Sequence, residues 1–179
     1  MNPVLRGVAA LVALAAAFPA LAQNPSPAAA PTPTSLGGAG GWKAYSYPDK
    51  GGKTCYLVGH PSASAPKNLN RGRVDAVVAH RLGDKAYNVV TFDLGTDAKD
   101  GAKAELVVGT KKFSLFIEKN AGWARDSATD KVIVTALAHG KSAKLTAHNA
   151  KGAATTDSYA LAGFGAALAA IDKGCGVKR

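Results

Sequence analysis

The sequence predicts a mainly β protein, an antiparallel sandwich or barrel with a closing helix and one further short helix. Three observations predict this fold class. Apolar and polar side chains alternate with a period of two over most of the chain after residue 42. Turn-forming segments such as 48–52 separate the alternating runs. A run of Ala, Leu and Ile over 164–172 instead has helical composition.

Eight segments carry the strand pattern, and several neighbours pair naturally as hairpins. The expected strands are residues 42–47, 54–59, 74–80, 87–94, 105–108, 112–118, 143–149 and 155–161. The clearest hairpin joins 105–108 to 112–118 through Gly109-Thr110, a pair typical of a type II′ turn. In its second strand, Phe113, Leu115 and Ile117 point to one face.

Two helices are expected. The first begins at Ser127, with Asp130 in its first turn, and ends at Gly140. The β-branched run over 132–135 would equally suit a strand. The second covers 164–172, with Gly174 as its cap immediately before Cys175.

Residues 1–22 are expected to be a secretory signal peptide. Arg6 precedes a short apolar run over 8–18, and Ala20-Leu21-Ala22 offers the small residues needed for cleavage. Residues 23–41 are rich in Pro, Ala and Gly and are expected to form a linker, so the folded domain is expected to be 42–179. No later segment has eighteen consecutive apolar residues, which predicts an exported mature chain without a transmembrane segment, in the periplasm or at the outer surface.

The chain has two cysteines, Cys55 and Cys175, and therefore room for one disulfide. Export to an oxidising compartment favours that bridge over two separate buried thiols. It would tie the closing helix to the second expected strand. A redox role would want a C-x-x-C pair, which the sequence lacks.

The formal net charge is +10 for 179 residues, and it falls by one if Arg6 leaves with the leader. Outside the cytoplasm, such a charge points to lipid phosphates, lipopolysaccharide or acidic glycans as partners. The densest basic segment contains Lys67, Arg71 and Arg73. These charges are either scattered for solubility or, as the alternative prediction, form a patch that contacts an anionic surface. Base-stacking aromatic residues do not interleave these charges, which argues against specific nucleic-acid recognition.

No motif in the sequence predicts a metal, a cofactor or a catalytic group. The four histidines lack the close spacing of zinc ligands: His60, His80, His139 and His148. The acidic loop over 93–101 has the wrong spacing for an EF-hand. Ser64 and Lys67 match S-x-x-K, but Pro66 lies between them and the partner motifs are missing. The glycine pair in 163–165 lacks the third glycine and the βαβ unit of a dinucleotide site.

Several blocks of the chain, in their order and spacing, resemble the invasion-associated locus B family. These blocks are residues 55–61, 121–124, 136–140, 151–152, 157–164 and Cys175. The most specific is Asp-Ser-Tyr-x-Leu-x-Gly-Phe over 157–164. The resemblance spans about residues 42–176 and implies an exported envelope protein with an immunoglobulin-like β-sandwich. It brings no established catalytic residues; the family takes its name from an association with host-cell entry.

The expected function is therefore non-enzymatic: an exported envelope protein that acts through contacts with a protein or an anionic envelope surface, with a link to host-cell interaction as the resemblance implies. The alternative is a periplasmic hydrolase or small-ligand binder whose site forms only in three dimensions. A pocket lined by convergent polar groups with shifted pKa values would favour that alternative. The sequence leaves the identity of the partner and the oligomeric state open.

Overall fold

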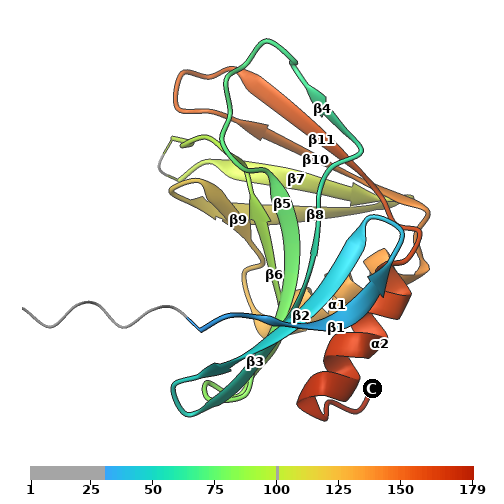
Figure 1. Ribbon diagram of the computed structural model, residues 1–179. Coiled ribbons are helices and arrows are strands. Elements are labelled where there is room, and N and C mark those ends of the chain that lie inside the picture. Colours follow the sequence, from blue (N-terminus) through green and yellow to red (C-terminus); the bar gives the residue numbers. More distant parts are fainter. Residues whose placement is uncertain (1–30, 100) are drawn as a thin grey trace, which may run out of the picture. The chain divides into compact units, whose positions relative to one another are not determined.

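The computed structural model describes residues 31–99 and 101–179 (Figure 1). The expected signal peptide, 1–22, and the first part of the expected linker, 23–30, lie outside the described residues. No helix within the described part of the chain is long and apolar enough to cross a membrane.

The described residues form eleven antiparallel strands in one hydrogen-bonded sheet, in the order β1-β2-β3-β5-β6-β9-β8-β7-β10-β11-β4 (Figure 1). The first strands along the chain are β1 (Thr34–Ala39), β2 (Trp42–Asp49), β3 (Gly52–Gly59), β4 (Ala63–Ala65), β5 (Asp75–Arg81) and β6 (Ala86–Asp93). The remaining strands are β7 (Lys103–Val108), β8 (Lys111–Glu118), β9 (Ala121–Trp123), β10 (Ser142–His148) and β11 (Ala154–Ala160).

The sheet encloses one core in a sandwich-like arrangement, which confirms the predicted fold class. The short strand β9 joins the two parts of the sheet, because it pairs with β6 on one side and with β8 on the other. Aromatic side chains connect the two parts across the core. Tyr159 of β11 lies 5.7 Å from Phe92 of β6 and 6.4 Å from Trp42 of β2, measured between ring centroids.

Alternation along β8 agrees with the prediction: Leu115 and Ile117 are buried, whereas Ser114 and Phe116 are exposed. The loop of this hairpin also behaves as predicted. Gly109 has a φ of 61° and Thr110 does not have a positive φ, as a type II′ turn requires. The regular period therefore located this hairpin from local sequence alone.

Helix α1 (Ser127–His139) forms where the sequence also suited a strand. Its N-cap is Asp126, one residue earlier than expected, and the Asp126 carboxylate accepts a hydrogen bond from the Thr129 amide at 2.7 Å. Helical spacing buries Ile133, Val134 and Leu137 together. A strand would have separated Ile133 from Val134 on opposite faces, so the core selects the helix.

Helix α2 (Phe164–Cys175) is longer than expected, and its cap is Gly176 rather than Gly174. Gly176 has a left-handed backbone with a φ of 66°, whereas Gly174 lies inside the last turn. A Cβ atom on Gly174 would lie 2.6 Å from Leu36 Cδ1. The glycine at 174 therefore permits close packing with β1 rather than ending the helix.

Residues 34–39 were expected to belong to the linker but form the edge strand β1, which pairs with β2 and packs against α2. The glycines around this hairpin allow backbone contact rather than forming a free joint. A Cβ atom on Gly40 would meet the Ala162 carbonyl oxygen, and one on Gly163 would meet that of Ala39. Sequence composition alone could not distinguish such a packed glycine hairpin from a linker.

The disulfide between Cys55 and Cys175 is formed and confirms the predicted bridge. It links β3 to the last turn of α2. In the sheet, Cys55 is opposite His80 of β5, and His80 Nε2 lies 2.8 Å from an Asp172 carboxylate oxygen. Two attachments three residues apart, Asp172 and Cys175, therefore hold one face of α2 against adjacent strands.

Candidate binding surface

Arg71 is not part of a surface patch, contrary to the prediction. Its side chain is only 6% exposed, and its guanidinium group forms a two-pronged ion pair with the Asp157 carboxylate, at 2.8 and 2.7 Å. It also donates to the Leu94 carbonyl oxygen at 2.9 and 2.6 Å. Ser64 donates a hydrogen bond to the same carboxylate at 2.7 Å. Arg71 therefore holds the 61–74 loop onto β11.

The other two residues of the predicted patch are exposed but differ in their surroundings. Lys67 lies on the surface of the same loop. The Arg73 side chain is 71% exposed, yet its Nε contacts the fully buried carboxylate of Asp75, which His60 Nδ1 contacts as well. Much of the charge of Arg73 is therefore matched by Asp75, and the three predicted residues do not form one free basic patch.

A different surface stands out: the outer face of β2, β3, β5, β6 and β9, which we call the aromatic face. Its side chains alternate with the buried ones, so they point away from the core and from α2. They are largely apolar and only partly buried: Tyr45, Tyr47, Tyr56, Val58, Val77, Ala79, Val89 and Trp123. A solvated sheet face is normally polar, so this one is unusual.

Cross-strand register arranges these side chains in rows. One row crosses four strands: Tyr45, Tyr56, Ala79 and Val89. The longer row crosses seven strands and has a lysine at each end: Lys43, Val58, Val77, Thr91, Trp123, Phe116 and Lys103. At about 4.8 Å between neighbouring strands, the row is roughly 29 Å long when measured along the sheet, which continues through β9 from one of its parts into the other. The row therefore borders a broad surface rather than a small pocket.

Three tyrosines form the most compact part of the aromatic face. Tyr56 stacks on Tyr45 with a centroid distance of 5.5 Å and meets Tyr47 edge-on at 6.0 Å. Burial, followed by the electrostatic effect of Tyr45 and of Tyr47, raises the pKa of Tyr56. Tyr56 therefore stays neutral at physiological pH, and the side chains between the two terminal lysines of the longer row carry no charge.

The outer face of β7, β10 and β11 provides an internal comparison. Its side chains are mostly polar: Lys103, Glu105, Lys144, Thr146, His148, Thr156 and Ser158. Both regions belong to the same sheet and share the same core. Core packing alone therefore does not require the aromatic face to be apolar, which makes it a candidate for binding.

At the far end of the long row, three cations surround an exposed aromatic ring in what we call the basic hollow. Lys103, Lys112 and Arg125 line a cavity of about 360 Å³ together with Phe116, which is 44% exposed. Acidic neighbours match two of these charges only weakly: Lys112 lies 3.4 Å from Glu105, and Arg125 lies 3.4 Å from Asp126. The hollow can therefore receive an anionic group beside an aromatic surface.

The sequence did carry a signal for the aromatic face. In β3 and β5, apolar residues occupy both alternating positions, as in 55–58 and 76–79, and in β6 the pair Val89-Val90 does the same. Such continuous runs are typical of strands covered on both faces. Here only one face is covered, and that fact depends on where the rest of the sheet folds.

The remaining sequence candidates have structural roles. His80 is fully buried near the end of β5, and His139 Nδ1 lies 2.8 Å from the Thr135 carbonyl oxygen at the end of α1. The 163–165 glycine pair makes the turn into α2. Within the two described ranges, no three His, Cys, Asp or Glu side chains come close enough to hold a metal ion.

His80 is the centre of a polar contact that joins α2 to the sheet. The Asn88 amide donates to His80 Nδ1 at 3.1 Å, so Nε2 carries the proton and donates to Asp172. Burial lowers the pKa of His80 below its ordinary value of 6.5, although Asp172 opposes this effect. His80 is therefore neutral at physiological pH.

This protonation state predicts a loss of stability in acid. Between the lowered pKa and 6.5, the unfolded chain binds a proton at His80 that the folded protein does not. The His80 contribution is therefore complete above pH 6.5 and decreases as the pH falls below it, by at most about 1.4 kcal/mol per pH unit. Urea unfolding between pH 7.5 and 5 should show this slope, reduced in His80→Gln but retained in His148→Gln, which alters an exposed histidine. Equal slopes in both variants would contradict the assignment.

Comparison with known proteins adds one match. A family model described as "Invasion associated locus B (IalB) protein" matches residues 42–172, which includes most of the folded unit. Neither a curated protein nor a solved structure matches the chain.

Proposed function

The chain belongs to the invasion-associated locus B family, and from that premise we propose that it is an exported, non-enzymatic protein of the cell envelope that binds an anionic envelope surface. The observation that carries this proposal is the basic hollow at the end of the aromatic face. Lys103, Lys112 and Arg125 surround the exposed ring of Phe116 there. Aromatic rings next to cations suit a surface that combines anionic groups with apolar parts.

Export is supported by the leader-like residues 1–22 and by the Cys55–Cys175 disulfide, since such bonds persist in oxidising compartments. Action by binding is supported by the extent of the aromatic face. Tyrosines and valines occupy the middle of its cross-strand rows, while the longer row has a lysine at each end. Apolar contact would then supply affinity, and the cations would orient the protein on the anionic surface.

The direct test measures retention of the mature protein on vesicles containing anionic lipid and on purified lipopolysaccharide. The triple variant Lys103→Ala/Lys112→Ala/Arg125→Ala should bind at least tenfold more weakly, because each cation near an anionic membrane contributes about 1 kcal/mol. Added salt should weaken binding of the unaltered protein, as screening requires.

A matched control removes the same charge elsewhere. The variant Lys67→Ala/Lys141→Ala/Lys151→Ala alters three exposed lysines outside the hollow, including the exposed lysine of the patch predicted from sequence. We expect it to retain most of the binding. Equal losses in both variants would show that only net charge matters and would overturn the role of the hollow. Binding that does not respond to salt would exclude the electrostatic mechanism.

A further inference from the structure

A second concave site lies away from the aromatic face, between the end of α2, the outer side of α1 and the start of β6. This groove has a volume of about 560 Å³, within the range of small-molecule sites. Its principal lining residues are Tyr87, Lys131, Thr135, Val177, Lys178 and Arg179.

The side chains that line the groove carry a net positive charge. Three of its lining residues are cations, and none of its lining residues is acidic. Lys131 and Lys178 are exposed. Arg179 forms an ion pair with Asp172, so the positive charge that remains without a carboxylate partner is that of the two lysines. A ligand that carries a negative group is therefore favoured over a neutral or cationic one.

Arg179 is held in place by three hydrogen bonds. Its Nε and Nη2 donate to the two oxygens of Asp172 at 2.6 and 3.0 Å, and Nη2 also donates to the Asn88 side-chain oxygen at 2.9 Å. Asp172 is itself oriented by the buried His80. These contacts use Nε and Nη2, which leaves Nη1 to donate to a ligand. The guanidinium group is thus preorganised, which lowers the entropy lost on binding.

Apolar groups supply part of the remaining lining, beside the polar Asn88 and Thr135. Tyr87 is one of the few large hydrophobic residues on the surface, with 42% of the residue exposed. Val177 is half-buried beside it, and Cys175 brings the disulfide to the groove wall. The ligand should therefore have an apolar body in addition to its anionic group.

We propose that this groove binds a single-chain anionic amphiphile, with its phosphate or carboxylate group at Lys131, Lys178 and Arg179 and its alkyl chain along Tyr87 and Val177. The site is separate from the basic hollow, so it adds a ligand to the proposed function and does not depend on it. Such a ligand would fit a protein in contact with lipid, as either a free fatty acid or a lipid phosphate.

The test uses dodecyl phosphate below its micelle concentration as the probe, with the folded, disulfide-bonded protein. Titration followed by NMR should give saturable shifts of the Tyr87 and Val177 signals. Dodecanoate should behave similarly, whereas inorganic phosphate and a neutral dodecyl maltoside should each bind at least tenfold more weakly, because each lacks one of the two contacts.

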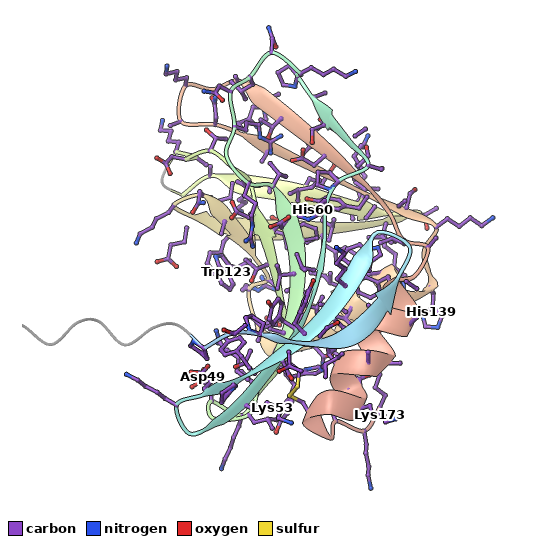
Figure 2. The ribbon with its side chains drawn as sticks, in the orientation of Figure 1. Asp49, Lys53, His60, Trp123, His139 and Lys173 are labelled. Carbon is purple, nitrogen blue, oxygen red and sulfur yellow. A yellow bond between two sulfur atoms is a disulfide. The ribbon has the colours of Figure 1, made fainter. Side chains whose placement is uncertain are left out.

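Two charge variants locate the site. Lys131→Ala/Lys178→Ala should weaken dodecyl phosphate binding by about tenfold or more, since hydrogen bonds between charged groups are stronger than those between neutral ones. Lys173, which Figure 2 labels on α2, is not among the residues that line the groove, so Lys173→Ala should leave binding unchanged. The triple variant of the basic hollow should also bind normally, which separates this proposal from the preceding one.

Three results would overturn the proposal: linear, non-saturating shifts; equal binding of the maltoside and the phosphate; or unaltered binding by Lys131→Ala/Lys178→Ala. A Val177→Asp variant provides an independent check on the apolar wall. It should weaken the alkyl phosphate more than inorganic phosphate. Its near-UV circular dichroism should match that of the unaltered protein.

Discussion

Removing the Cys55–Cys175 disulfide should lower the free energy of unfolding by several kcal/mol. The bond closes a loop with a sequence separation of 120 residues. The chain-entropy model gives about 5 kcal/mol for a loop of this length, and removal of native disulfides from small domains costs roughly 2–5 kcal/mol. Since whole domains are stable by only about 5–15 kcal/mol, this is among the largest effects that a substitution in this protein can have.

Urea unfolding of Cys55→Ala/Cys175→Ala, compared with the oxidised protein, measures this difference. Reductant should bring the unaltered protein close to the variant and should leave the variant itself unchanged. Limited proteolysis should then cut first near the end of α2, which is still held to the sheet by the contact between Asp172 and His80 and by the hydrogen bond from Lys53 to the Gly174 carbonyl oxygen. A difference below about 1 kcal/mol, well under the range for native disulfides, would contradict the prediction.

The second large effect is expected at Arg71. Arg71→Ala would leave the carboxylate of Asp157, which is 1% exposed, buried without its cation. Breaking one side of a buried ion pair typically destabilises by about 3–5 kcal/mol. The 61–74 loop and β4 should also loosen, because Arg71 and Ser64 share the Asp157 carboxylate.

Chemical denaturation measures the first consequence, and hydrogen exchange of residues 61–74 measures the second. Lys67→Ala is the matched control, since it removes an exposed cation from the same loop and should change stability little. The double variant Arg71→Leu/Asp157→Leu should recover much of the loss, because it removes both charges rather than leaving one unpaired. If Arg71→Ala were as stable as Lys67→Ala, the buried ion pair would not contribute to the free energy of unfolding.

Much of the fold follows from local sequence, and its elements show why. The strand period of two identified all eight predicted strands within a few residues, as in β8, where Leu115 and Ile117 are buried between exposed neighbours. The two-residue turn at 109–110 set the hairpin register in the same way. Short or atypical elements escaped this reading: β9 has three residues, and β1 is rich in glycine. A periodic pattern cannot be recognised over so few side chains.

The candidate surfaces were much less accessible to sequence reasoning. Lys67, Arg71 and Arg73 are close along the chain, yet the Arg71 side chain is buried. It forms an ion pair there with Asp157, which is 86 residues away in the sequence. Conversely, Lys103, Lys112 and Arg125 come together only because β7, β8 and the start of α1 meet at one hollow. Charge density along a chain therefore did not predict charge density on the surface.

The sequence by itself determined the mainly β fold, the two helices and the single pair of cysteines available for a disulfide, because side-chain periodicity and residue type act over a few neighbouring positions. Only the tertiary structure decided which apolar face stays uncovered, which arginine is buried and which cations share a hollow. Each of these depends on residues brought together from distant strands. Their separation along the sequence does not predict the distance between them in the folded protein.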